Sequence, residues 1–301
     1  MLRKMVLYVA CFVALIHSSE AQKTAPTAPS RTVQTQANAN SLLWEITGKG
    51  LTHPSYLFGT IHMICPQDFF ITPAMKEKFA EARTVYLEIN LSDPSAPLKL
   101  MEMIQLKNGR KLGDLFDPAD YKLLTQFVHD TLQMDIHFFE RFKPLMLYSM
   151  LSTKMLSCAK EQAYEMEFIQ MAKQQEKPVK GLETMEDQVA VFDSIPGKVQ
   201  AGMIMDMVKD FNTQKKDFGR LIDLYKAQQV DSLFDMVSAD PDTRIDQDLL
   251  LDSRNRKWIP LISSAIHQGT CFIAVGAGHL GGPQGLLSLL RKHGYTVKAV
   301  L

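Results

Sequence analysis

The stretch "SYLFGTIH", residues 55–62, is a run of mostly apolar residues followed by Gly-Thr-Ile-His. The stretch "FIAVGAGH", residues 272–279, has the same form near the other end of the chain. Short apolar runs that end at glycine are typical of buried strands. The two stretches therefore predict two core strands, each followed by a histidine in a Gly-x-x-His motif.

The sequence around each motif predicts further strands and helices. "LLWEI" and "SYLFG" read as a hairpin, "ITPAMKEKFAEA" as a helix that starts at Thr-Pro, and "TVYLEIN" as a strand. The C-terminal end reads strand, helix, strand in "CFIAVGAGH", "GPQGLLSLLRKHG" and "YTVKAVL". A strand, a helix and a second strand suggest a parallel crossover. We therefore expect an α/β fold whose mixed sheet combines N-terminal and C-terminal strands.

The middle of the chain, about residues 98–260, has helical spacing of its apolar residues. Pro144 is expected to divide or kink one of these helices, and "FGRLIDLYKAQQVDSLFDMV", residues 218–237, reads as one helical stretch. A short strand is expected in "KPVKGLET", residues 177–184. Residues 42–301 are thus predicted to form a single domain with a large helical insertion.

The N-terminus has the pattern of a secretory signal peptide. A basic "MLRKM" precedes eleven apolar residues and a small-residue cleavage site, so we expect a signal peptide over residues 1–21. Residues 22–41, rich in Thr, Ala, Pro, Gln and Asn, are expected to be a flexible leader. The protein is then exported to a periplasmic or extracellular location, without a stable membrane span. An uncleaved anchor and a lipoprotein modified at Cys11 are the alternatives.

The composition is that of an ordinary globular protein. The 301 residues are 46% apolar and 22% charged, and the formal net charge is zero. A chain without net charge has no long-range field to attract nucleic acid or an anionic membrane, so we expect neither as a partner. Of the cysteines, Cys271 begins an apolar strand and is expected to be a buried thiol. Cys65 and Cys158 lie in polar settings and form a disulfide or remain free.

Four polar residues follow predicted strands at or just beyond their carboxyl ends: His62, Glu88, Glu183 and His279. Functional groups of open α/β sheets collect at these ends, so the four side chains are expected to converge if the strands are parallel neighbours. Two neutral imidazoles and one or two carboxylates are suitable ligands for a divalent metal, such as Mn, Co or Zn. We therefore predict His62, Glu88 and His279 as metal ligands.

Each of these residues also has a structural interpretation. A single Gly-x-x-His is weak evidence for a ligand, and Glu88 could lie at an exposed sheet edge. Glu183 could be a favourable charge at a helix N-terminus, since "LETMEDQ" follows. Arg254 and Asn255 could lie on a solvated helix face, or could reach a substrate or a site carboxylate.

Three glycines adjoin the predicted site: Gly59, Gly276 and Gly278. We expect them to provide positive φ or close backbone approach where strands end. H-E-x-x-H and G-x-S-x-G are both absent, which excludes a helix-borne zincin and an α/β-hydrolase elbow.

The chain resembles the TraB/GumN family, which includes the Tiki proteins. The resemblance rests on "LWEI", "SYLFGTIH", "VYLEIN", "GLETMEDQ", "DSRNRKW" and "FIAVGAGHLGGPQGLLSLLRKHGYTV", in this order from about Leu42 to Leu301. It implies a metal-dependent hydrolase with both Gly-x-x-His motifs and Glu88 in the active site. It also implies a mixed α/β sheet with helices, like that of erythromycin-esterase and ChaN-like proteins.

Together these observations predict an exported metal-dependent hydrolase that acts on a peptide or protein substrate. Its catalytic residues are Glu88, Glu183 as base or supporting partner, and Arg254 as oxyanion or carboxylate contact; Asn255 is a substrate-binding residue. The alternatives are a non-catalytic protein that binds a peptide or haem in the same cleft, and hydrolysis of a non-peptide ester.

Overall fold

The computed structural model describes residues 39–238 and 247–301. The predicted signal peptide and residues 22–38 of the predicted leader lie outside these residues. Ser41, at the end of the predicted leader, is buried, and its hydroxyl donates hydrogen bonds to the carbonyls of Leu43 and Val300. Among the helices of the described residues, none is both long and apolar enough to cross a membrane.

A six-stranded mixed sheet forms the centre of the molecule, in the order β4-β3-β5-β2-β1-β6. Only β1 runs against its neighbours β2 and β6. The central strand β5 lies between β2 and β3 and is parallel to both. The sheet thus combines strands from both ends of the chain, as predicted. The strands are β1 (Leu43–Thr47), β2 (Ser55–Thr60), β3 (Thr84–Leu87), β4 (Val179–Gly181), β5 (Cys271–Gly276) and β6 (Thr296–Ala299).

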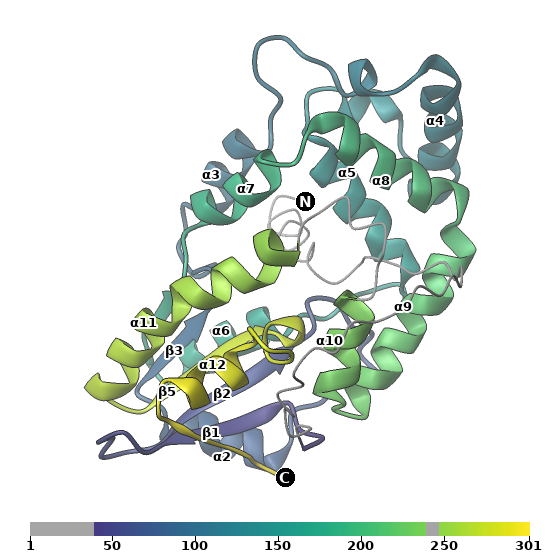
Figure 1. Ribbon diagram of the computed structural model, residues 1–301. Helices are drawn as coiled ribbons and strands as arrows, with labels where there is room; N and C mark the ends of the chain where they lie inside the picture. The colour runs from purple at the N-terminus through teal and green to yellow at the C-terminus, as the bar shows by residue number, and fades with distance from the viewer. Residues whose placement is uncertain (1–38, 239–246) are drawn as a thin grey trace, which may run out of the picture.

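Helices cover both faces of the sheet (Figure 1). On one face, Phe79 of α2 (Pro73–Glu81) and Phe168 of α6 (Tyr164–Gln174) contact Phe272 of β5, with ring centroids 5.1 and 5.0 Å apart. Figure 1 shows α11 (Ser253–Gln268) and α12 (Leu286–Lys292) on the viewer's side of the sheet. This layering leaves the ends of the central strands as the place where side chains from both halves of the chain can meet.

The helical middle extends away from the sheet, where α4, α5 and α8 contact one another (Figure 1). Pro144 is the first residue of α5, so it separates this helix from the preceding 3₁₀ turn as expected. The remaining helices are α3 (Ala96–Met103), α4 (Pro118–Leu132), α5 (Pro144–Ser152), α7 (Met185–Asp193), α8 (Gly197–Lys209), α9 (Phe211–Lys226) and α10 (Val230–Ser238), and a π-helical stretch over Asp248–Asp252 leads into α11.

The single helical stretch predicted over residues 218–237 is wrong, because the chain turns between α9 and α10. Gln228 adopts a left-handed conformation with φ 55°, and its side-chain oxygen accepts a hydrogen bond from the backbone N–H of Leu42. The sequence has no glycine or proline at this turn to announce it.

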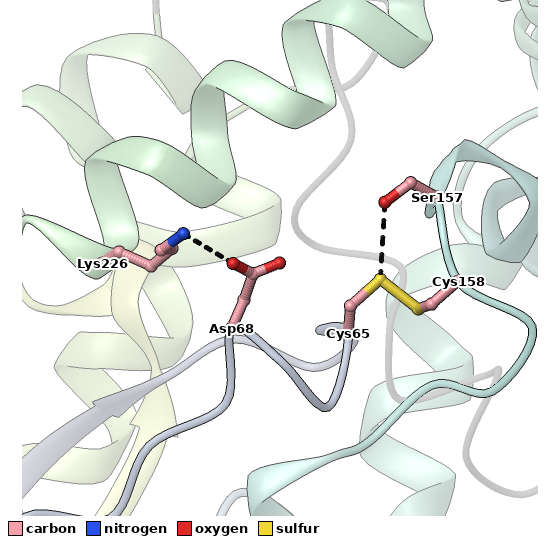
Figure 2. The surroundings of a disulfide bond; sticks show 5 residues. All are labelled: Cys65, Asp68, Ser157, Cys158 and Lys226. Carbon is pink, nitrogen blue, oxygen red and sulfur yellow. Dashed lines mark hydrogen bonds and ion pairs between the residues drawn. A yellow bond between two sulfur atoms is a disulfide. The ribbon is translucent and has the colours of Figure 1, made fainter.

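A disulfide joins Cys65, in the loop after β2, to Cys158, in the loop before α6 (Figure 2). The same two loops pair through backbone hydrogen bonds between Ile64 and Gln162. Asp68 extends this connection to α9 through an ion pair with Lys226. The segment that follows His62 is therefore tied to the segment that leads into α6.

Candidate active site

The carboxyl ends of β2, β3 and β5 bring three predicted residues together over Gly276. The backbone N–H of Gly276 donates a 2.7 Å hydrogen bond to Oε1 of Glu88. A Cβ added to Gly276 would lie 3.1 Å from Nε2 of His62 and 3.3 Å from Oε1 of Glu88. His279 completes the group, with its Nε2 3.8 Å from the same carboxylate oxygen. Residues far apart in the sequence thus meet because their strands are neighbours in one sheet.

The glycines of the site differ in their roles. None of the three predicted glycines has positive φ. Gly59 and Gly276 are sites of close approach, since a Cβ on Gly59 would lie 2.7 Å from a methyl group of Leu280. Gly278 has only ordinary contacts, at 3.8 Å or more, so the predicted need for glycine at this position is wrong.

Arg254 lies between the two carboxylates of the site. Its Nη2 donates to Oε2 of Glu88 and to Oε1 of Glu183, both at 2.6 Å, and its Nε donates to the other oxygen of Glu183 at 3.2 Å. Its Nη1 lies 3.1 Å from Nε2 of His279. The side chain is 4% exposed. Of the two predicted alternatives for Arg254, the structure therefore has the contact with site carboxylates and not the solvated helix face.

Glu165, on α6, holds His62 through its carboxylate. Its Oε1 lies 3.0 Å from Nδ1 of His62 and accepts a 2.7 Å hydrogen bond from Thr60. Glu165 is not among the site residues predicted from the sequence. Its signal was its spacing, because Glu165, Phe168 and Ala172 recur at the i, i+3, i+7 positions of a buried helix face. A carboxylate on that face needs a partner.

Asn255 holds His279 in a corresponding way. Its side-chain NH₂ donates to the carbonyls of His279 and Gln284, so its Oδ1 accepts the Nδ1–H of His279 at 2.7 Å. Asn255 is 1% exposed. The structure thus gives its side chain a histidine-orienting position, with its amide oxygen and NH₂ group both bonded within the protein.

Burial and charge act oppositely on the titrating groups. Burial alone would raise the pKa of Glu88, but Arg254 and the two histidines outweigh it and lower this pKa to about 2. Burial raises the pKa of Glu183 despite the nearby guanidinium. The site therefore holds one firmly ionised carboxylate and a second whose proton affinity is increased.

The histidines are also shifted in opposite directions. Burial lowers the pKa of His279 to about 3, against the attraction of Glu88. Burial also disfavours the charged form of His62, but the Glu165 carboxylate outweighs it, and the pKa of His62 rises. His279 is therefore a neutral imidazole at physiological pH, whereas His62 is the more basic of the two.

The donor set suits a divalent metal in its chemistry. Each histidine has Nδ1 engaged by an oxygen acceptor and Nε2 on the side of Glu88, which is the usual arrangement of ligands with supporting partners. Within residues 39–238 and 247–301, however, no three His, Cys, Asp or Glu side chains are grouped as they would be around a metal ion. The cation against Glu88 is the guanidinium of Arg254.

Comparison with known proteins identifies the family. The sequence profile of the TraB/PrgY/gumN family matches residues 42–299, nearly the whole described fold. The chain belongs to this family. It is 23% identical to Metalloprotease TIKI1 of Danio rerio, over 96% of this chain and 68% of the relative. It is 26% identical to the uncharacterized protein YbaP of Shigella flexneri, over 87% of this chain and 97% of that protein.

Over a shorter segment, the sequence identity to a human relative is higher. The chain is 37% identical to Metalloprotease TIKI1 of Homo sapiens over 86 residues, which are 28% of this chain and 16% of the human protein. No solved structure gives a significant match.

Proposed function

We propose that this family member is an exported metal-dependent hydrolase that cleaves peptide bonds. The observation that carries the proposal is the meeting of two imidazoles and the Glu88 carboxylate at the carboxyl ends of three neighbouring parallel strands. Its similarity to proteins named metalloproteases supports the same activity. His62, Glu88 and His279 are the proposed ligands, and a bound divalent metal would polarise a carbonyl and activate water.

Glu183 and Arg254 are proposed to serve the reaction directly. The increased proton affinity of the Glu183 carboxyl suits a group that takes up and releases a proton. Arg254, which stays charged, is suited to donate a hydrogen bond to a developing oxyanion, a contact worth about 3 kcal/mol of barrier. The side-chain Nε2 of Gln188 donates hydrogen bonds of 3.3 Å to one carboxylate oxygen of Glu88 and to one of Glu183. Gln188 therefore positions the two carboxylates relative to each other.

The test combines metal analysis with peptide cleavage. Purified protein would be incubated with Mn²⁺, Co²⁺ or Zn²⁺, and bound metal and cleavage of a mixed peptide library measured for wild type, His62→Ala and His279→Ala. We expect stoichiometric metal and metal-dependent cleavage in wild type, and loss of both in the two variants. His267→Ala is the matched control, since His267 is exposed on α11 away from the cluster.

Two results would contradict the proposal. Equal metal content in wild type and both variants would show that His62 and His279 are not metal ligands. Metal binding without cleavage of any peptide would favour a protein that only binds its ligand in this cleft. Export would be tested separately, by N-terminal sequencing of the protein recovered from outside the cytoplasm.

A further inference from the structure

A cavity opens beside the two histidines, between the ends of β2 and β5 and the helices α9 and α10. About 400 Å³ of space not filled by protein atoms lies here, part of it open to solvent. His62 and His279 line it on one side, and Leu221, Leu233 and Val237 on the other. A group held in this cavity is therefore adjacent to the candidate active site.

Several polar side-chain atoms along the cavity wall already have partners within the protein. The hydroxyl of Tyr225 donates to the carbonyl of Gly59 at 3.0 Å, and Thr60 donates to Glu165. His279 uses Nδ1 on Asn255 and faces Arg254 with Nε2. The far wall is contributed by aliphatic side chains. A charged or amide side chain placed there would lose its hydration without gaining hydrogen bonds, which is strongly unfavourable.

We propose that this cavity is a specificity subsite that binds an aliphatic side chain of the substrate peptide, such as Leu, Ile, Met or Val, next to the bond that is cut. This proposal rests on the proposed peptidase function, because it names the substrate of the same site. Hydrophobic pockets distinguish side chains by about 10- to 200-fold for each methylene gained or lost. The protein therefore prefers aliphatic over charged residues at that position of a peptide.

Val237 is the residue through which the cavity can be altered with least risk to the fold. It is only partly buried near the end of α10, and it faces Gly278, whose added Cβ would lie 3.9 Å from a Val237 methyl group. Val237→Phe narrows the cavity, and Val237→Asp places a carboxylate in its wall. Met236→Phe is the matched control, because Met236 is the preceding residue of the same helix, is also partly buried and does not line the cavity.

The first measurement is kcat/KM for peptides that differ at one position, Leu, Ala, Lys or Asp. We expect Val237→Phe to lower the preference for Leu over Ala at least about tenfold. Val237→Asp is expected to shift preference toward Lys, and Met236→Phe to leave the pattern of wild type. Unchanged preferences in both Val237 variants, with cleavage intact, would overturn the subsite while leaving the hydrolase in place.

The second measurement does not depend on catalysis. Binding of N-acetyl-leucinamide and N-acetyl-lysinamide would be followed through the methyl NMR signals of Leu221, Leu233 and Val237. The leucine compound is expected to shift these signals in wild type, and not to shift the remaining Leu221 and Leu233 signals in Val237→Phe. The lysine compound is expected to leave the signals of both proteins unchanged. This result in a protein that cleaves no peptide would retain the subsite and reject the hydrolase. No shift with the leucine compound would reject the subsite.

Discussion

His62 and His279 occupy matching Gly-x-x-His motifs after neighbouring parallel strands, yet their surroundings differ. His62 faces the Glu165 carboxylate, whereas His279 faces the Asn255 amide and the Arg254 guanidinium. The pKa of His62 is accordingly raised, and that of His279 is lowered to about 3. The motif places an imidazole at the site, and partners from distant elements decide whether that imidazole holds a proton.

The two halves of the site are also supported in different ways. Next to His62, a disulfide and a backbone bridge join the loop after β2 to the loop that leads to Glu165. Next to His279, the support comes from α11, where the ring of Trp258 lies 4.5 Å from the imidazole and 4.8 Å from the guanidinium of Arg254. One half is therefore held by a covalent link and the other by side-chain packing and charge.

The largest effect is expected from Arg254→Met, which removes the cation from the His279 half. Glu88 and Glu183 would lose their buried partner, so we expect unfolding free energy to fall by about 3–5 kcal/mol in urea denaturation. Because the guanidinium lowers the pKa of His279, this pKa should rise in the variant when followed by NMR. Divalent metal should bind more tightly, since Arg254 no longer competes for Glu88.

Arg256→Met is the control for this variant. Arg256 lies two residues away on the same helix and forms an exposed ion pair with Asp248, so its loss should cost less than about 1 kcal/mol. Equal losses of unfolding free energy in the two variants would mean that the buried contacts of Arg254 with Glu88 and Glu183 stabilise the fold no more than a surface ion pair does. An unchanged pKa of His279 would show that burial alone makes it neutral.

Removal of the disulfide tests the other half. The bond joins cysteines 93 positions apart, so Cys65→Ser with Cys158→Ser should lower unfolding free energy by about 2–4 kcal/mol. NMR signals of His62 should shift because the loops that position Glu165 are released, whereas those of His279 should not. Cys271→Ala, at the buried free thiol, is the control for loss of a cysteine. Equal shifts of both histidines would contradict separate support of the two halves.

The pH dependence of stability should show both histidines with opposite slopes. His279 is neutral in the folded protein down to about pH 3, but the unfolded chain protonates it below pH 6.5. Its contribution to stability is therefore lost as pH falls below 6.5, by up to about 2 kcal/mol between pH 6.5 and 5. Glu183, with its raised pKa, acts in the opposite sense there, and Glu88 titrates only at lower pH.

His62 contributes on the alkaline side. The folded protein holds its proton above pH 6.5, so this contribution is complete below that pH and is lost as pH rises through the raised pKa. Urea unfolding from pH 5 to 8 would separate the two groups. His279→Gln should flatten the acid slope, and His62→Gln the alkaline one. A variant that alters the slope assigned to the other histidine would contradict this division.

Much of the fold was predictable because its signals are local. Apolar runs that end at glycine marked β2 and β5, and Thr72-Pro73 marked the start of α2. The convergence of His62, Glu88 and His279 followed from one topological rule, that parallel neighbours end at the same sheet edge. These features depend on a few adjacent residues and on strand direction.

The supporting partners were not predictable in the same way. Glu165 reaches His62 from 103 positions away, and Arg254 reaches Glu88 from 166 positions away. No pattern around a charged residue on a helix tells which carboxylate or histidine it will meet. The turn at Gln228 was not predictable for a related reason. A non-glycine residue takes the left-handed conformation there, where the packing requires it.

The smallest expected effect, and the most specific one, is that of Glu165→Gln. Glutamine keeps an oxygen that can accept from Thr60 and from Nδ1 of His62 but removes the negative charge, so the pKa of His62 should fall in an NMR titration. Glu167→Gln, on the same helix, is the control and should leave the titration unchanged. His279 should titrate alike in all three proteins. An unchanged His62 in Glu165→Gln would mean that the raised pKa depends on Glu88 instead, the other carboxylate that favours its charged form. A lowered pKa would attribute the difference between the two Gly-x-x-His motifs to one carboxylate that neither motif contains.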